Sequence, residues 1–580
     1  MQLLIRLSDL LYDTFVLVRN VLVSLFGPRR AYVLLELSGP YPDYRGRDPW
    51  WVRQPETIED VRRQLAVIRA DRRAAGVVMT IRDLPAGLAS VQSLRAAFAD
   101  YRARGGRVVA YLTQPTTRQY YLASVADEIV MPESSVLDLG GAALEVTFLG
   151  EALERAGIAG EFEQIAEYKS AVEPLTRRTM SEPMREQFNA ILDSVFDDLT
   201  AEVAAARRLD PGAVRAAIDR APLSAADARA AGLIDAIFYD DELPAHLGAD
   251  GRRPPAIVPW RFARRRLRRP FRWRFPGRAV AVITVRGGIQ MGESRPRPPI
   301  PLPLRGEAAG HASVIRAIRS VERNPLFGAI VLSIDSPGGS ALASDLIWRA
   351  VVQAGRVKPV VAYFGNVAAS GGYYVAAGAH RIVAQPGTLT GSIGVISGKF
   401  VVQRLAGRAG VRHEILARGE AAAMTSPFRP FSAEERRRLR AQAEEIYARF
   451  LDRVAEGRRL SREQVHAVAR GRVWTGRQAL EHQLIDRLGD FYSAIDTAKE
   501  LMGVGPARVV PVLIVRPPRA VTIGRRSALG GLEALGPLAS LAPLASLAAI
   551  GGAAGHAWTL ADTFLREGVL ALLPWDIRLR

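Results

Sequence analysis

The chain contains no cysteine in its 580 residues. Disulfide bonds and thiolate metal sites are therefore excluded, and cysteine usage leaves the redox compartment open. Metal and cofactor motifs are also missing. Glycine clusters such as "GVGPAR" lack the strand-to-helix context and the lysine of a phosphate-binding loop. We therefore expect neither a metal nor a cofactor.

Acidic residues are fewer than basic ones, 59 against 78, which gives a formal net charge of +19. Part of the excess is concentrated in "RFARRRLRRPFRWRFPGR", with nine arginines between Arg261 and Arg278. Such a run could contact anionic lipid head groups or nucleic acid, at about 1 kcal/mol per charge near an anionic membrane. The alternative is a solvated basic connector. As partners we expect membrane lipids and no nucleic acid.

A long uninterrupted apolar run is lacking at the N-terminus, because Arg6, Asp9, Asp13 and Arg19 interrupt residues 1–26. At 100° per residue the polar side chains fall on one narrow face. This pattern predicts an amphipathic helix that lies in a membrane interface, with a tilted span as the alternative. No small-residue cleavage site closes the segment, so we expect it to be retained.

The C-terminal region is also a poor candidate for a spanning helix. From about Ser527 it contains the uncharged stretch "LGPLASLAPLASLAAIGGAAG", which Pro537 and Pro543 interrupt. Proline kinks a helix and glycine weakens it. We therefore expect a loosely packed or membrane-associated tail.

The sequence does contain a long internal repeat. "GVVMTIRDLPAG" from Gly76 matches "GAIVLSIDSPGGS" from Gly328, 252 residues later, and "YYLASVADEIV" from Tyr120 matches "YYVAAGAHRIV" from Tyr373, 253 residues later. Within each copy, short β-branched runs alternate with amphipathic helical stretches, which predicts βα units around a largely parallel sheet. The expected fold class is α/β, with two tandem domains.

The expected organisation has five segments. They are an N-terminal membrane-associating helix (1–28), the first α/β repeat (29–245), an Arg-rich linker (246–278), the second α/β repeat (279–508) and an Ala/Leu/Gly-rich tail (509–580). Because packing preserves the symmetry of a repeat, positions where the two copies differ are candidates for chemistry.

Two differences between the copies are complementary. Ser370, in the small-residue turn "AASGGYY", aligns with Thr117 of the first copy, which lacks such a turn. Lys169, in "EYKSAVEP", aligns with Ala422 of the second copy, while the flanking glutamate and proline match. One copy thus has the lysine and the other the serine, and we interpret them as a single Ser-Lys site completed across the two domains.

A serine hydroxyl is a weak nucleophile and needs a base within hydrogen-bond reach. Lysine can serve once burial in an apolar pocket has lowered its pKa enough to leave it neutral. Backbone amides of Gly338 and Gly339 in "DSPGGS", and of Gly371 at the start of the following helix, are the expected donors to a developing oxyanion. The first copy has a proline in place of Gly338, which has no amide hydrogen to donate.

The same residues allow two other interpretations. His380, in "AAGAHRIV", is the histidine nearest to Ser370 in sequence, but it points toward the following strand and Asp127 takes its place in the first copy, so a surface or capping role is favoured. The Gly-Gly pair could be only a tight turn, and Ala-Ser-Gly-Gly only close helix packing. The asymmetric lysine favours the catalytic interpretation over both.

Residues 30 to 500 resemble the long form of signal peptide peptidase A, the protease IV family (peptidase family S49), which is related in fold to ClpP and the crotonases. The resemblance rests on "DSPGGS", "NVAASGGYYVAAGA", "TLTGSIGV" and "EYKSAVEP", in matching order and spacing. It implies a ClpP/crotonase-like fold, Ser370 as nucleophile, Lys169 as general base, and Ser392 of the "TGSIG" loop hydrogen-bonded to the lysine amine.

The resemblance further implies cleavage of released signal peptides and similar apolar peptides. It implies a homotetramer attached to the extracytoplasmic face of the inner (cytoplasmic) membrane. The four charges in the N-terminal segment depart from the cleaner spanning helix of the family, and the tail after about residue 510 has no counterpart there.

Three classes of function are thus compared: a membrane-associated Ser-Lys endopeptidase, a crotonase-like acyl-CoA enzyme, and a non-catalytic membrane scaffold. The complementary loss of lysine and serine in the two copies favours the peptidase. An acyl-CoA enzyme would share the sheet and the glycine loop without needing the Ser-Lys pair, and a scaffold would tolerate loss of either residue.

Overall fold

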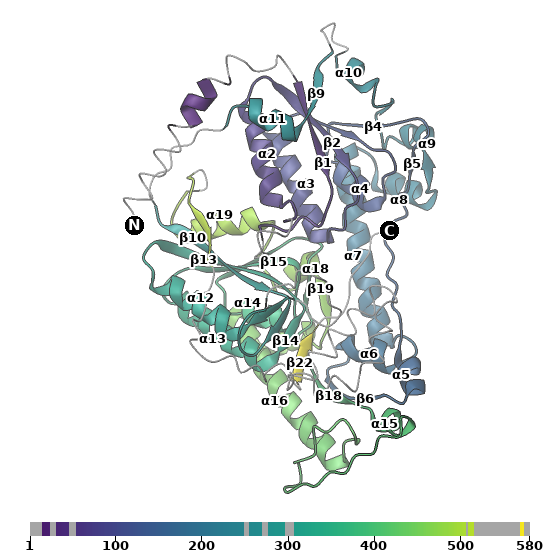
Figure 1. Ribbon diagram of the computed structural model, residues 1–580, viewed down its shortest axis with the longest axis vertical. Helices are drawn as coiled ribbons and strands as arrows, with labels where there is room; N and C mark the ends of the chain where they lie inside the picture. Colours follow the sequence, from purple (N-terminus) through teal and green to yellow (C-terminus); the bar gives the residue numbers. More distant parts are fainter. Residues whose placement is uncertain are drawn as a thin grey trace.

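The computed structural model describes most of the chain between Ala31 and Val515, a few residues of an N-terminal helix and a short strand near the C-terminus. The described residues are 14, 16–21, 23, 31–45, 54–248, 254–269, 277–295, 307–505, 508–515 and 569–572. The chain has an α/β fold in which the first repeat lies above the second and the long helix α7 runs down beside the second (Figure 1).

The first repeat is built on a six-stranded parallel sheet. Its order is β8 (Ala236–Ile237), β4 (Glu128–Met131), β3 (Val108–Tyr111), β2 (Ala74–Ile81), β1 (Ala31–Leu37) and β9 (Ala256–Pro259). The runs rich in valine and alanine are buried on both faces, as expected where helices cover a parallel sheet. A separate antiparallel pair joins β5 (Val136–Leu137) to β7 (Leu223–Ser224).

The second repeat has the same strand order. It runs β20 (Arg487–Leu488), β16 (Arg381–Ala384), β15 (Val360–Ala369), β13 (Phe327–Ser336), β10 (Ala279–Arg286) and β21 (Val512–Ile514), all parallel. In addition, β17 (Leu389–Gly391) pairs with the end of β15, and β19 (Val473–Thr475) pairs antiparallel with β17. The two copies detected in the sequence are therefore two α/β units of one topology.

Helices cover these sheets. Those of the first repeat are α2 (Ile58–Ala70), α3 (Leu88–Ala103), α4 (Thr117–Ala123), α5 (Gly150–Ala156), the 3-10 turn η1 (Ser170–Val172), α6 (Glu173–Thr176), α7 (Glu182–Arg207), α8 (Pro211–Asp219), α9 (Ala225–Ala230) and α10 (Leu243–His246). Those of the second are α12 (His311–Arg323), α13 (Ala341–Gly355), α14 (Gly371–Ala376), α15 (Gln403–Arg408), α16 (Ala433–Arg458), α17 (Arg462–Val468), α18 (Gly476–Glu481) and α19 (Phe491–Leu501).

Local sequence explains where these helices begin and which face they bury. In α2, Thr57 and Asp60 form a reciprocal capping box that satisfies backbone donors of the first turn. The buried apolar side chains follow the three- and four-residue spacing of one helix face, namely Ile58, Val61, Leu65 and Ile68. In α7 the cap is Ser181, whose side chain accepts the amide hydrogen of Met184.

A third sheet contains strands from both repeats. Its order is β12 (Ala308–Gly310), β11 (Gly288–Gln290), β14 (Gly338–Ser340), β22 (Val569–Leu572), β18 (Val395–Val401) and β6 (Ala159–Ile165). The first-repeat strand β6 runs antiparallel to β18, with Val395 opposite Ile165 and Val401 opposite Ala159. The first repeat therefore contributes an edge strand to a sheet that otherwise belongs to the second repeat and the tail (Figure 1).

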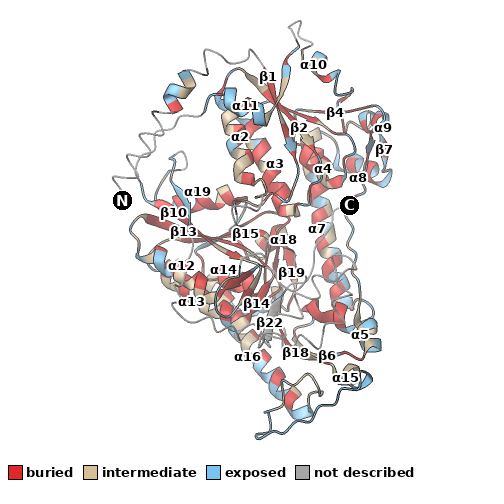
Figure 2. Cartoon of the chain, viewed as in Figure 1, coloured by how far each residue is buried: buried red, intermediate tan, exposed pale blue. Residues whose placement is uncertain are grey.

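The buried core crosses the seam between the repeats. Figure 2 shows the buried residues along the sheets and the inner faces of the helices. The core cluster of the first repeat also includes Ala369, Leu389 and Val473, which belong to the second. The two units are thus packed together over the region where β15 ends and β17 begins.

The predicted linker and the N-terminal helix lie together at one edge of the first sheet. Within residues 246–278, β9 extends that sheet and α11 (Trp260–Arg266) packs against it. The guanidinium of Arg19 donates to the backbone oxygen of Leu267 at 3.0 Å, while Leu17 and Val18 are exposed. Among the described residues, no helix is both long and apolar enough to cross a membrane. The predictions for residues 1–13 and for most of the tail fall outside the described residues.

Candidate active site

Ser370 lies at a sharp turn between β15 and α14. Its backbone has a φ of 55° and a ψ of −115°, a conformation that residues other than glycine rarely adopt. The amide of Ser370 donates to the oxygen of Gly391 at 2.8 Å, and its oxygen accepts from the amide of Tyr374 at 2.8 Å. The turn is therefore held from both sides, as expected where backbone strain persists at a functional residue.

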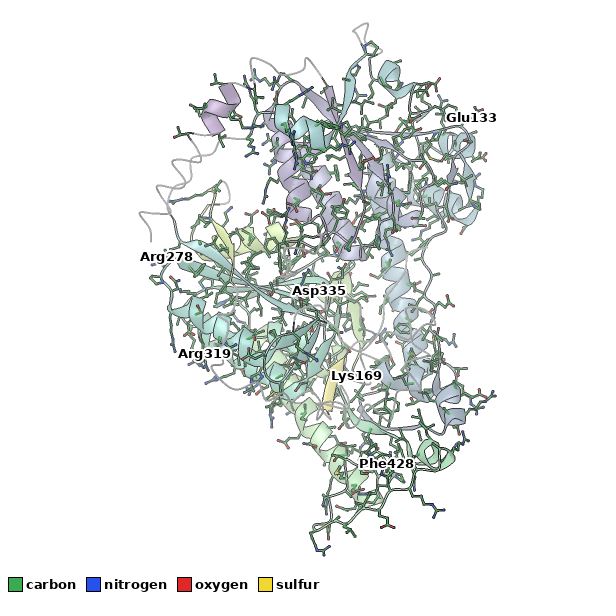
Figure 3. All side chains as sticks on the ribbon, viewed as in Figure 1. Glu133, Lys169, Arg278, Arg319, Asp335 and Phe428 are labelled. Carbon is green, nitrogen blue, oxygen red and sulfur yellow. The ribbon has the colours of Figure 1, made fainter. Side chains whose placement is uncertain are left out.

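Lys169 reaches Ser370 from the other repeat. It follows β6, so the β6–β18 pairing carries the lysine out of its own repeat and against the second. Figure 3 places its label beside the second repeat, well below the first sheet. Its Nζ is 2.6 Å from the Oγ of Ser370, although the two residues are 201 positions apart in sequence. The structure thus brings the predicted pair together within one chain.

Ser392 completes a three-way contact with the lysine amine. The Nζ of Lys169 lies 2.7 Å from the backbone oxygen of Ser392 and 2.9 Å from its Oγ. A neutral amine has two N–H donors and one lone pair. It can donate to the two oxygens of Ser392 and accept the hydroxyl proton of Ser370, which uses all of its hydrogen-bonding capacity.

Burial explains why this lysine can be neutral. Lys169 is 1% exposed and Ser370 is 0% exposed. Burial lowers the pKa of Lys169 well below its ordinary value, because the charged ammonium loses its hydration. A neutral amine next to a serine hydroxyl is the protonation state that a general base requires.

Three residues that sequence reasoning missed fix the position of Lys169. Gln187 of α7 donates to Ser170 at 3.1 Å and accepts from the amide of Val473 at 2.8 Å, which joins the lysine turn to β19. A Cβ added to Gly471 would lie 2.5 Å from the backbone nitrogen of Lys169, so only glycine allows this approach. Arg470 forms an ion pair with Glu167. None of the three belongs to a recognisable motif.

The predicted oxyanion glycines differ in their surroundings. The amide of Gly338 donates to the Oγ of Ser336 at 3.1 Å, so it already has a partner. Gly339 has a φ of 153°, and a Cβ on Gly371 would lie 3.1 Å from the nitrogen of Gly339. The Gly339 amide therefore lies next to Gly371, the residue that follows Ser370, whereas the Gly338 amide is engaged within its own turn.

The remaining candidate base lies elsewhere. His380 is exposed, and its Nδ1 accepts from the amide of Val360 at 3.1 Å. Val360 begins β15, whereas Ser370 follows its last residue, so the whole strand separates the histidine from the serine. Among the described residues, no group of three histidine or acidic side chains is placed to hold a metal ion.

Comparisons with known proteins identify the family to which the chain belongs. The sequence model of "Peptidase family S49" matches residues 101–250 and 353–505. The chloroplastic serine protease SPPA of Arabidopsis thaliana is 34% identical over 74% of this chain and 63% of its own length. Protease 4 of Haemophilus influenzae is 30% identical over 72% of this chain and 68% of its own length.

Among solved structures, a mutant of the 1510-N membrane-bound stomatin-specific protease in complex with a substrate peptide is similar at 17% identity. The match covers 42% of this chain and 95% of that chain, with a TM-score of 0.27. Family assignment therefore rests on the sequence matches, which extend over both repeats. The resemblance inferred from the four motifs is confirmed, and the chain belongs to peptidase family S49.

Proposed function

We propose that the protein is a serine endopeptidase with a Ser370–Lys169 dyad, built on two ClpP/crotonase-like domains. The observation that carries the proposal is the 2.6 Å contact between a buried, desolvated lysine amine and the hydroxyl of a serine in a strained turn. Nucleophile and base within hydrogen-bond reach, with the base fixed by a third group, are the signature of covalent catalysis.

The proposed chemistry proceeds in two steps. Neutral Lys169 takes the Ser370 proton as the Oγ attacks the peptide carbonyl, and the amides of Gly339 and Gly371 stabilise the oxyanion. The lysine then gives that proton to the leaving amine, which produces an acyl-enzyme. Water, activated by the same amine, hydrolyses the ester in the second step.

The proposed substrates are apolar peptides, including released signal peptides, as the family resemblance implies. The test is acylation by a small serine-directed probe, located by mass spectrometry, together with hydrolysis of an apolar peptide. We expect one labelled residue, Ser370, and loss of both readouts in Ser370→Ala but not in the exposed control Ser38→Ala. A crotonase-like enzyme or a scaffold would leave Ser370 unlabelled and the peptide intact.

We also propose attachment to the extracytoplasmic face of the inner membrane through the N-terminal helix. Its described part turns Arg19 toward the Arg-rich segment and leaves Leu17, Val18 and Val21 exposed. An apolar face beside basic residues suits an interface rich in anionic lipid. Deletion of residues 1–26 should release the protein from membranes. A deletion variant that stays bound would show that the C-terminal tail is the anchor instead.

A homo-oligomer, a tetramer by family resemblance, is proposed from one further asymmetry. The second-repeat segment that aligns with β6 is 412–418, and residues 407–422 are all exposed at the lower tip of the molecule (Figure 2). We propose that this arm docks on the first repeat of another copy as β6 docks on β18. Head-to-tail contacts of this kind form a ring when the rotation between successive copies closes. Leu416→Asp, at a side chain 95% exposed, should lower the mass measured by light scattering.

A further inference from the structure

A strand from the C-terminal tail lies inside the third sheet. Strand β22 pairs antiparallel with β14 on one side, with Gly339 opposite Ala571. On its other side it pairs antiparallel with β18, with Ile396 opposite Leu570. Figure 1 shows it between β14 and β18. The tail therefore fills a one-strand slot between the glycine loop and the strand that holds the lysine arm.

This slot is next to the Ser-Lys pair. Residue Leu572 of β22 lies opposite Gly338, and β22 also contacts α14, the helix that follows Ser370. The chain direction brings the C-terminal end of β22 to the glycine loop. Ser370 itself is 0% exposed. A nucleophile that must attack a peptide carbonyl is covered in this arrangement.

The slot has the dimensions of an extended peptide. Neighbouring strands lie about 4.8 Å apart, so β14 and β18 are about 9.6 Å apart and leave two facing edges with backbone donors and acceptors. Recognition by strand addition uses such edges, because main-chain hydrogen bonds provide affinity for many sequences. An intramolecular strand competes for these edges at an effective concentration of about millimolar or higher.

We propose that residues 569–572 act as a built-in competitor that occupies the peptide slot and restrains the enzyme until a substrate displaces it. The proposal rests on the proposed peptidase function for its activity readout, and on the strand pairing for its binding readout. The segment lies beyond residues 353–505, the second-repeat match to the family model.

The first experiment measures peptide hydrolysis in the full chain and in two variants. One variant ends at Gly568, and the other is full-length with Leu570→Pro and Ala571→Pro, which remove two backbone donors from β22. We expect kcat/KM to rise about tenfold or more in both. The matched control, Ala571→Val, keeps the donors and should stay within about twofold of the full chain.

The second experiment measures binding without catalysis. In a Ser370→Ala background, a fluorescent peptide of residues 569–580 should bind the chain ending at Gly568 at least about tenfold more tightly than the full-length chain. Equal affinity for the two chains, or no binding, would overturn the proposal, as would unchanged hydrolysis in the proline variant. If Ser370 is never acylated, the proposed function fails while the binding result still decides the inference.

Discussion

The two repeats share a topology, yet they differ at the end of equivalent strands. In the first repeat, α4 begins with an ordinary capping box between Thr116 and Gln119, with a φ of −78° at the cap. In the second, α14 begins at Ser370 with a φ of 55°. The strand-to-helix connection therefore does not impose the strain. At this position only the copy that carries the proposed nucleophile is strained, as expected if the strain serves chemistry rather than packing.

The opposite difference is seen in the arms. The first-repeat arm is paired as β6 and ends in buried Lys169, whereas the second-repeat arm is exposed and has Ala422 at the aligned position. Each copy thus contributes one half of the proposed site. The four predictions below test this division, from the largest expected effect to the smallest.

Lys169→Ala should reduce both acylation of Ser370 and peptide hydrolysis by about 1,000-fold or more, because the amine that contacts the hydroxyl is removed. The matched control is Lys399→Ala, whose Nζ instead binds the oxygens of Met424 and Ser426. Burst kinetics with an ester substrate measure the acylation step. Comparable losses in both variants would show that a buried lysine is needed only for folding.

Ser392→Ala should lower kcat/KM by about tenfold to a hundredfold without abolishing acylation, because one of the two oxygens that orient the amine remains. In the unaltered enzyme, activity should rise with pH through the lowered pKa of Lys169, because only the neutral amine accepts a proton. The pH profile of kcat/KM checks both points. A limb that disappears in His380→Ala and survives in Lys169→Ala would contradict this assignment.

Asp43→Asn tests the seam between the repeats. Tyr363 donates to Asp43 at 3.1 Å, and burial raises the pKa of Asp43 to about 7, against the opposing charge of Arg286. The carboxyls of Asp335 and Asp490 face the same group. Between about pH 4 and pH 7 the folded chain keeps a proton that the unfolded chain has lost.

Stability should therefore fall as pH rises toward 7, by at most about 1.4 kcal/mol per pH unit, and level off above it. Asp43→Asn should flatten this dependence in urea unfolding followed from pH 4.5 to pH 8. Burial also raises the pKa of Asp335, so Asp335→Asn is the companion variant. If the dependence of stability on pH is unchanged in both variants, these two carboxyls at the seam do not cause it.

Thr117→Ser should have the smallest effect. It places a serine at the first-repeat position that aligns with Ser370, but the turn there is relaxed and the Thr117 Oγ accepts from the amide of Gly141 at 3.2 Å. We expect no new labelling by the acylating probe and a change in stability within about 1 kcal/mol. Labelling at residue 117 would show that position alone, without base or strain, is sufficient.

The sequence was sufficient to predict the residues that meet at the site because the repeat provides an internal comparison. Ser370 and Lys169 stand out only where one copy departs from the other, and Ser392 entered through the family resemblance. Gln187 and Gly471 could not be predicted in this way, because one acts through contacts with backbone groups of the other repeat and the other through close approach.

Strand β22 was not predicted for a different reason. Four apolar residues in a tail rich in alanine and leucine give no periodic pattern that distinguishes a strand from its surroundings. The hydrogen-bond partner of the Gly338 amide could not be predicted either. A Gly-Gly pair indicates a flexible backbone, but it does not indicate which amide already has an acceptor.

Because β6 of the first repeat pairs with β18 of the second, the site can form only after the second repeat has been synthesised. Lys169 leaves the ribosome 201 residues before Ser370. Gly471, which packs against the lysine, follows about a hundred residues after Ser370. At about 5–20 residues per second, the interval from Lys169 to Gly471 lasts about 15–60 s. A nascent first repeat therefore carries the proposed base without the proposed nucleophile, so under the proposed mechanism an unfinished chain cannot cleave itself or its neighbours before the second repeat has folded.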